Sequence, residues 1–202
     1  RILVELFKIL NLKSFINFNE STYLKEIFNF IFPEFANLKR LDKLKEILNS
    51  SKISLNLLLA ILLIDKDSNH EYFCHKYNVS NDIKDDLNLL AKNLKLLQNK
   101  KDFFTKDIEK HIYLNDKSHL INLNILNFAS NSEYSFKNFS EAMKNILKSK
   151  IHKFHIDGKY LMNKGMSEGV LIGKVLRKIE EEWIQNNFKI SDNRVQEIIK
   201  QN

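Results

Sequence analysis

The chain has almost none of the residues that make tight turns, and this scarcity limits the folds open to it. Its 202 residues include 4 Gly and 1 Pro. β-Sandwiches and doubly wound sheets need repeated tight connections, for which glycine and proline are the usual residues. With 44% hydrophobic residues the chain still has enough apolar material for a core. We therefore predict an all-α protein, a multi-helix array with no β-sheet.

The glycines are confined to one short window. They are Gly158, Gly165, Gly169 and Gly173. Glycine is needed where the backbone adopts positive φ or comes unusually close to another group. We therefore expect the special backbone geometry of this chain, and its functional site, in that window.

The charge balance favours an anionic partner. The net charge is +7 and the pI is about 9.3, and such a basic excess is a statement about partners and solubility and says nothing about fold. The basic residues are 28 Lys and 4 Arg, which we interpret in part as a composition bias. The number of lysines alone is therefore a weak argument for nucleic-acid binding.

The chain has features of a cytoplasmic protein. A single cysteine, Cys74, excludes an internal disulfide framework and fits a reducing compartment. The longest apolar run, residues 53–64, is shorter than the ~18 residues that span a bilayer, so we expect a buried helix and no membrane contact. No charged and then apolar leader opens the sequence at Arg1, and we expect the chain to be part of something longer.

Apolar spacing and capping residues predict a succession of helices. A second helix should follow Asn19 or Ser21 and end before Pro33, because the residue before proline is pushed out of the helical region. Ser80 should cap the most regular of the helices, and no constant repeat indicates a solenoid. The expected helices are 1–10, 21–32, 40–49, 53–64, a short one with Tyr72, Phe73 and Tyr77, then 81–99, 106–114, 118–129 and 136–149.

The glycine window predicts two helices joined by a tight turn. Asp157 can cap the first helix, and Gly165 stands where a left-handed residue ends it. Ser167 or Gly169 should start the second helix, in which Gly173 would let a neighbouring helix approach closely. The expected buried stripe of this second helix is Val170, Leu171, Val175, Leu176, Ile179 and Trp183.

The second helix has its charges in the order that its dipole disfavours. Lys174, Arg177 and Lys178 lie in its first half and three glutamates, residues 180–182, in its second. Each exposed charge near the wrong end costs about 0.3 to 1 kcal/mol, and pairs such as Lys178 with Glu182 recover less. A phosphate bound at a glycine-opened helix start would compensate for the basic residues. The alternative is a tight helix corner with a solvated charged face, and the residues alone leave both open.

The same window resembles a known signature. The run GKYLMNKGMSEGVLIGKVLRKIEEEWI is similar to the C-terminal tail of bacterial CCA-adding tRNA nucleotidyltransferases and related poly(A) polymerases, although Val170 stands where a proline is usual. At the other end RILVELFKIL resembles the neck helix of that family, through Arg1, Ile2, Glu5, Leu6 and Lys8. The LDKL at residues 41–44 is compatible but less specific. The resemblance implies a neck remnant at 1–36, an RNA-binding helical body at 37–150 and a tRNA-binding tail at 151–202.

The resemblance also implies what this chain does not contain. The catalytic head of the family precedes the neck and carries paired carboxylates after a Gly-Ser turn, which hold Mg²⁺ for transfer from CTP and ATP. No Gly-Ser turn followed by Asp-x-Asp occurs here. We expect a chain that is inactive alone and has no cofactor of its own, either an excised fragment or the partner of a separate chain that carries the head. CCA addition and poly(A) addition differ through the missing motifs, so that choice stays open.

Other chemistry is weakly supported. The spacing of His70, Cys74 and His75 offers some metal ligands without a second cluster to complete a site, and we predict no metal. Asp85 with Asp86 point in different directions on a helix, which is poor geometry for an acid and base pair. His152 and His155 can touch phosphate or cover a domain junction, and Tyr160 can stack on a base.

Two functions of different classes remain. In the first, the chain holds tRNA: the body follows the acceptor stem by shape and phosphate contacts, and the tail holds the distal region. In the second, it is a helical interaction module with no RNA role. The RNA-contacting residues of the first hypothesis are Lys159, Lys164, Gly165, Gly169, Gly173, Lys174, Arg177 and Lys178.

Overall fold

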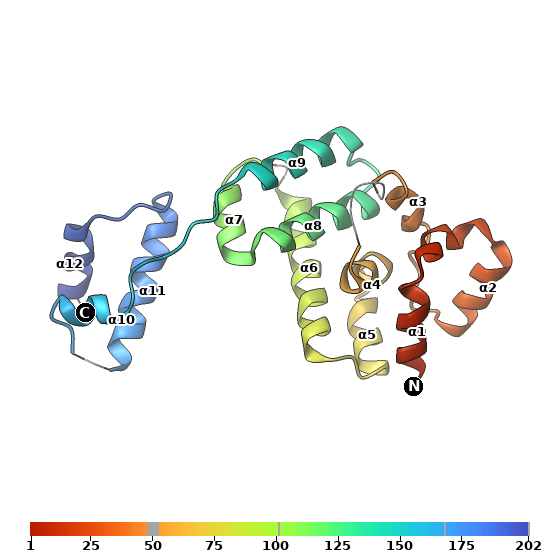
Figure 1. Cartoon of the computed structure of the whole chain (residues 1–202), viewed down its shortest axis with the longest axis horizontal. Coiled ribbons are helices and arrows are strands. Elements are labelled where there is room, and N and C mark those ends of the chain that lie inside the picture. Colours follow the sequence, from red (N-terminus) through yellow and green to blue (C-terminus); the bar gives the residue numbers. More distant parts are fainter. Residues whose placement is uncertain (48–52, 101, 168, 202) are drawn as a thin grey trace. The chain divides into compact units, whose positions relative to one another are not determined.

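The computed structural model describes residues 1–47, 53–100, 102–167 and 169–201. Every regular element within these ranges is a helix and none is a strand, which confirms the all-α prediction (Figure 1). The chain divides into two compact units, one of residues 1–106 and 117–148 and the other of residues 107–116 and 149–202. Residues 107–116 fall within the body expected at 37–150, but they group with the C-terminal residues.

The N-terminal unit contains nine helices among its described residues. They are α1 (Ile2–Leu10), the 3₁₀ helix η1 (Lys13–Glu20), α2 (Thr22–Ile31), α3 (Arg40–Leu44), α4 (Leu55–Leu63), α5 (Asn69–Lys76), α6 (Asn81–Asn99), α8 (Lys117–Ser130) and α9 (Phe136–Lys148).

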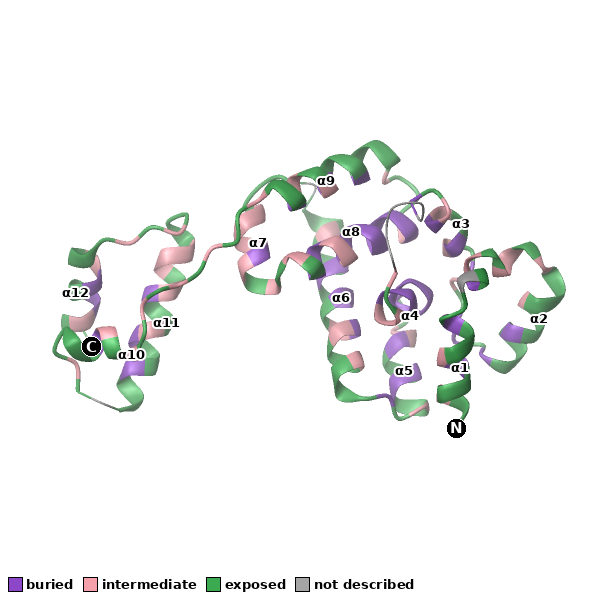
Figure 2. Cartoon of the chain, in the orientation of Figure 1, coloured by how far each residue is buried: buried purple, intermediate pink, exposed green. Residues whose placement is uncertain are grey.

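The core of this unit forms around α4. Its sequence LNLLLAILL is apolar on all sides, as expected of a helix that no face exposes to water. Residues 57–63 are all buried, and α1, α5, α6 and α8 contact the helix, as Figures 1 and 2 show. The hydroxyl of Ser54 accepts a hydrogen bond from the Leu57 amide at 3.2 Å and caps the start.

Two basic residues of α3 stabilise the ends of other helices. Arg40 donates to the carbonyls of Ile61 and Ile64 at 2.8 and 2.7 Å, after which α4 ends. Lys43 donates to two carbonyls at the C-terminal end of α8, at 2.7 and 3.2 Å. Carbonyls at a helix end lack intrahelical partners and attract cations. Burial lowers the pKa of the Arg40 guanidinium, so these charges serve the fold of the body.

The first three elements enclose a cluster of phenylalanines. Phe28 of α2 lies 5.0 to 5.8 Å, between ring centroids, from Phe15, Phe18, Phe32 and Phe35. Such separations suit edge-to-face and offset packing. These aromatic residues therefore act as core.

The outer faces of α1 and α2 are more apolar than expected. Ile2 and Ile9 of α1 are 61% and 37% exposed. On α2 only Phe28 is buried, and a continuous stripe of large apolar side chains faces outward. That stripe is Tyr23, Leu24, Ile27, Phe30 and Ile31.

Most predicted helices are present, with differences at their ends. α2 begins after Ser21, whose hydroxyl accepts from the Leu24 amide at 3.3 Å, and it ends before Pro33, both as predicted. The helix expected at 40–49 is short, Arg40–Leu44, and the expected end at Asn49 lies outside the described residues. Ser80 precedes α6 but makes no capping bond, and Ser118 lies inside α8. Thr105, which precedes the helix expected at 106–114, donates its hydroxyl to the Asp102 carbonyl.

The C-terminal unit is a small helical domain. It contains α7 (Ile108–Asn115), α10 (Gly158–Asn163), α11 (Val170–Gln185) and α12 (Asp192–Lys200). α11 contacts both α10 and α12. Its buried core is Leu161, Ile172, Val175, Ile179, Val195 and Ile198.

Candidate nucleic-acid interface

The turn between α10 and α11 has the geometry that the glycine spacing predicts. The Asp157 carboxylate accepts from the Tyr160 amide at 2.8 Å and caps α10. At the other end, the amides of Gly165 and Met166 donate to the carbonyls of Met162 and Leu161, at 2.9 and 3.2 Å. This pair of bonds is the Schellman motif, which needs a residue of positive φ at its centre. Gly165 provides it, with φ +99°.

The start of α11 is open to solvent. Gly169 precedes the helix with φ +149° and ψ −173°, a conformation almost restricted to glycine. Within the described residues no side chain caps this end, and Val170 beside it is 85% exposed. Unpartnered first-turn amides attract anions, and Lys174 lies one turn further along the helix.

The close helix approach expected at Gly173 is wrong. A Cβ added there would meet no described atom of a neighbouring helix within 4 Å. The close contact occurs at Gly158, where an added Cβ would lie 3.4 Å from Cγ2 of Ile172. The position of the glycine window that faces the neighbouring helix is therefore Gly158, where a methyl group would still fit in ordinary contact.

The expected buried stripe of α11 is also partly wrong. Val170 and Leu171 are 85% and 43% exposed, whereas the unpredicted Ile172 is buried with Val175 and Ile179. Apolar spacing alone did not separate Leu171 from Ile172, because the partner helices decide which direction is inward. The outer face of α11 consequently combines apolar residues with cations.

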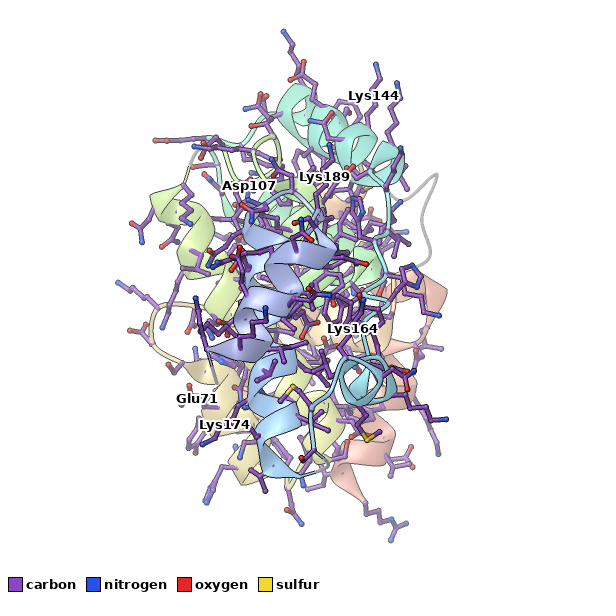
Figure 3. All side chains as sticks on the ribbon, turned by 90° about the vertical axis from the view of Figure 1, so that its left-hand side faces the viewer. Glu71, Asp107, Lys144, Lys164, Lys174 and Lys189 are labelled. Carbon is purple, nitrogen blue, oxygen red and sulfur yellow. The ribbon has the colours of Figure 1, made fainter. Side chains whose placement is uncertain are left out.

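The predicted basic residues fall into two groups. Lys174, Arg177 and Lys178 are exposed on α11, and Arg177 and Lys178 lie three and four residues after Lys174, which places them beside it on the helix. Lys159 lies in α10, and Lys164 is the residue directly after this helix. Figure 3 shows Lys174 of α11 and Lys164, which follows the end of α10, apart from each other. The structure therefore does not gather all five cations into one cluster.

Lys164 has partners within its own unit. Its Nζ lies 3.7 Å from Oδ2 of Asp192 and 5.4 Å from the ring centroid of Tyr160. The Tyr160 hydroxyl donates to Oδ1 of the same aspartate at 3.0 Å. In contrast, no ion pair within the described residues engages Lys159, Lys174, Arg177 or Lys178. These four predicted cations therefore have no ion-pair partner among the described residues that would compete with a ligand.

Glu182 has a different partner from the one expected. It accepts a bidentate pair of hydrogen bonds from Arg194, at 2.6 and 3.0 Å, instead of pairing with Lys178. Arg194 also donates to Glu197 at 2.8 Å, and its bonds to Glu182 lower the pKa of that carboxyl. The planar guanidinium of Arg194 can donate to both oxygens of one carboxylate. The pairing therefore joins α11 to α12 and does not involve Lys178.

Aromatic packing attaches α7 to α11. The rings of Tyr113 and Trp183 lie 5.3 Å apart, and Phe188 packs 4.9 Å from Trp183. The Tyr113 hydroxyl donates to Glu180, and burial together with this bond raises the pKa of Tyr113 to about 12. Glu180 is thus not simply a solvated charge.

His152 belongs to the same aromatic cluster. Its ring stacks on Phe188 at 3.8 Å and its Nε2 lies 2.5 Å from Oε2 of Glu109. This hydrogen bond holds the pKa of the Glu109 carboxyl below its usual value. His152 thus holds the segment before α10 against α7, whereas His155 is exposed.

The neck residues form a local surface pair. Lys8 and Glu5 lie 2.9 Å apart on α1, both well exposed, and Arg1 precedes the helix. Such a pair contributes little to stability. Nothing in the structure assigns these residues a further role.

No alternative chemical site emerges. His70 and Cys74 are buried, and no group of three metal-binding side chains occurs among the described residues. Asp65 and Asp67 form an Asp-x-Asp without the Gly-Ser turn, and Oδ1 of Asp65 accepts from the amides of Asp67 and Asn69 at 3.0 and 3.3 Å. That carboxylate therefore organises the start of α5. Across the described ranges, no helix is long and apolar enough to cross a membrane.

The division into units shows where the positive charge lies. Residues 1–106 and 117–148 contain 21 Lys and Arg and 15 Asp and Glu, whereas residues 107–116 and 149–202 contain 11 and 10. The first unit therefore carries +6 of the net charge and the second +1. The candidate cations expected from the sequence lie in the tail, whereas most of the excess positive charge lies in the first unit, as a count of charges by segment shows.

One family comparison decides the affiliation of the chain. The model of the family described as tRNA nucleotidyltransferase domain 2 matches residues 48–199. The chain belongs to this family. No curated protein and no solved structure matches the chain. The match covers most of the body and the tail, so the chain is a tRNA nucleotidyltransferase-related C-terminal part.

Proposed function

We propose that this chain is the tRNA-holding part of a tRNA nucleotidyltransferase and positions the 3′ end of tRNA for addition of CCA. The observation that carries the proposal is the outer face of α11 in a chain of this family. There, Lys174, Arg177 and Lys178 stand exposed beyond an uncapped helix start, with no acidic partner among the described residues. In a tRNA nucleotidyltransferase-related chain, the anions that such cations would bind are the phosphates of tRNA.

The chemistry is assigned to residues outside this chain. Nucleotidyl transfer needs carboxylates that hold Mg²⁺ around the attacking and leaving oxygens. The 202 residues contain no Gly-Ser turn ahead of an Asp-x-Asp, and the one Asp-x-Asp present is used in a turn. A catalytic head, on the same polypeptide or on a separate chain, would bind CTP and ATP.

A salt-dependent titration tests the tail. Labelled tRNA lacking its CCA end is titrated with the chain at about 50 and 200 mM salt, a range over which phosphate contacts weaken steeply. The double variant Lys174→Glu and Arg177→Glu should bind more weakly, with a smaller salt slope. Lys189→Glu with Lys200→Glu makes the same charge change in the same unit and is the matched control.

The outcomes are clearly separated. Weaker binding by the first pair only supports the tail as a tRNA contact. Unchanged affinity of the Lys174 and Arg177 variant, or equal losses in both pairs, contradicts it.

A second candidate function is protein contact through α2. Its outward stripe includes Phe30, which is 89% exposed, and Tyr23, which is 72% exposed. A row of exposed aromatic and aliphatic residues is unusual for a surface that faces only water. If the chain binds no tRNA at low salt, and Phe30→Ser removes its association with other proteins, this function replaces the first.

A further inference from the structure

Asn127 of α8 is a buried amide that the fold leaves unpaired. Two other asparagines of the N-terminal unit are buried among its described residues, and both are bonded within it. Asn93 is bonded to Nε2 of His119 at 2.9 Å, and Asn124 donates to the Phe139 carbonyl at 3.0 Å. Asn127 is 7% exposed, and its side chain makes no hydrogen bond to any described residue. A buried amide without a partner is unfavourable for folding, so its presence calls for an explanation other than packing.

The amide of Asn127 is accessible from outside the core. The side-chain atoms that are fully enclosed and unpartnered belong to Asn19, Glu34 and His70, so the exposed fraction of Asn127 includes its oxygen and nitrogen. Asn127 lines two grooves, of about 520 and 720 Å³. Small-molecule sites commonly have volumes of ~300 to 1,000 Å³. Both grooves therefore suit a ligand of that size.

The two grooves meet around Asn127. Gln98 of α6 lines both of them, as do Asn131 and Glu133, which follow α8. Helix α8 packs against both α6 and α9 (Figure 1). The side chains of Gln98 and Glu133 have no hydrogen-bond or ion-pair partner among the described residues. This junction therefore offers uncharged donors and acceptors beside one carboxylate.

The smaller groove favours a flat, uncharged group. Glu133 and Glu141 line it, and Lys100 is the one lysine or arginine among the described residues that does so. A phosphate in this groove would be repelled by the two carboxylates. Phe104 and Tyr134 line the same groove and provide aromatic surface. Flat heterocycles stack on such rings.

The larger groove provides positive charge that the fold does not use. Arg40 and Asp65 line it, but Arg40 donates to helix-end carbonyls and Asp65 accepts from two amides. Lys66 and Lys95 also line it, and both are exposed without an ion-pair partner among the described residues. Lys95 lies one turn before Gln98 on α6, so a cation stands beside the junction. A phosphate is therefore favoured on this side.

We propose that the junction of the two grooves binds a free nucleoside monophosphate. Its base lies in the smaller groove and pairs with the amide of Asn127, and its phosphate lies in the larger groove toward Lys66 and Lys95. An asparagine amide matches adenine in particular, because it can donate to a ring nitrogen and accept from the neighbouring amino group. Glu133 can accept from the ribose hydroxyls. The site lies wholly within the N-terminal unit and does not depend on the proposed tRNA function.

The test measures binding of AMP to the full chain by isothermal titration calorimetry, with adenosine and glucose as comparison ligands. Asn127→Ala is the test variant, and Asn122→Ala, on the same helix but outside both grooves, is its matched control. Asn127→Ala should weaken AMP binding by about 5- to 150-fold, the loss of a bidentate base contact, whereas the control should change it by less than about 2-fold. Unchanged AMP affinity of Asn127→Ala overturns the inference.

A second pair of variants tests the phosphate side. Lys95→Gln should weaken binding of AMP by about 2- to 5-fold and leave adenosine unaffected. Lys92→Gln, an exposed lysine of α6 outside both grooves, should change neither. Equal effects of the two lysine variants contradict the placement of the phosphate and overturn the inference.

Stability separates a ligand contact from a structural role. Asn127→Ala should keep or raise the Tm, because it removes an unpaired amide, whereas Asn124→Ala loses hydrogen bonds and should lower it. A Tm of Asn127→Ala as low as that of Asn124→Ala would show that the fold needs the amide, and the inference would be wrong. No saturable binding of AMP up to about 10 mM, or glucose competing as well as AMP, also overturns it.

Discussion

The glycine window contains two residues at which the same substitution should have opposite effects. Gly165 has φ +99° and an added Cβ would touch nothing within 4 Å, so the cost of alanine there is backbone strain alone. That cost is about 1 to 2 kcal/mol. Gly173 lies inside α11 with open space around it, and alanine there should stabilise the helix by about 0.8 to 1.0 kcal/mol. The two variants should therefore differ by about 2 to 3 kcal/mol.

Unfolding of the C-terminal unit can be followed directly, because the only tryptophan, Trp183, lies in it. For a unit of this size about 1 kcal/mol corresponds to a shift of roughly 4 to 8 °C in Tm. Gly165→Ala should lower the fluorescence-detected Tm, and Gly173→Ala should raise it above the unmodified chain. A destabilising Gly173→Ala would show that another helix does approach there. A neutral Gly165→Ala would show that the Schellman turn does not require glycine.

Three further predictions concern the contacts that hold each unit. Arg40→Met should destabilise the body by about 2 to 4 kcal/mol in urea unfolding followed by circular dichroism, because two buried carbonyls lose a charged donor; a value near zero would contradict its capping role. Asp157→Ala should cost the C-terminal unit about 1 kcal/mol by loss of its cap, measured by Trp183 fluorescence, whereas Asp157→Asn should recover most of it. The bond from His152 lowers the pKa of Glu109 in the folded state, so its stabilisation is present above the unfolded pKa of about 4.3 and is lost as pH falls through the folded value. Glu109→Gln should therefore flatten the stability profile below about pH 5, and an unchanged acid slope would refute this assignment.

The helix ends that the sequence predicted best are those set by nearby residues. Pro33 ends α2 through its own ring, and Ser21 and Asp157 cap helices through amides three residues away. Gly165 turns the chain because its neighbours form a local Schellman motif. Each of these is a short-range effect, and the residue type carries the information.

Charge placement was harder to predict because partners come from distant segments. Arg40 caps the C-terminal end of α4. It lies before that helix in the chain and donates to carbonyls more than twenty residues further on. Glu182 pairs with Arg194 and not with Lys178, because the fold places the guanidinium within hydrogen-bond distance of both carboxylate oxygens. Which lysines stay free for a ligand, including Lys174, follows only after such pairs are known.

The sequence by itself therefore determined the all-α class, most helix positions, the tight turn at Gly165 and the resemblance that the family comparison supports. Local propensity, capping and turn chemistry act over a few residues, and the sequence displays them directly. Only the tertiary structure decided that α7 packs with the tail, that Ile172 and not Leu171 faces the core, and that Gly173 has no close neighbour. Those outcomes depend on which helices meet and at what angle, because the direction that counts as inward exists only once the helices are packed.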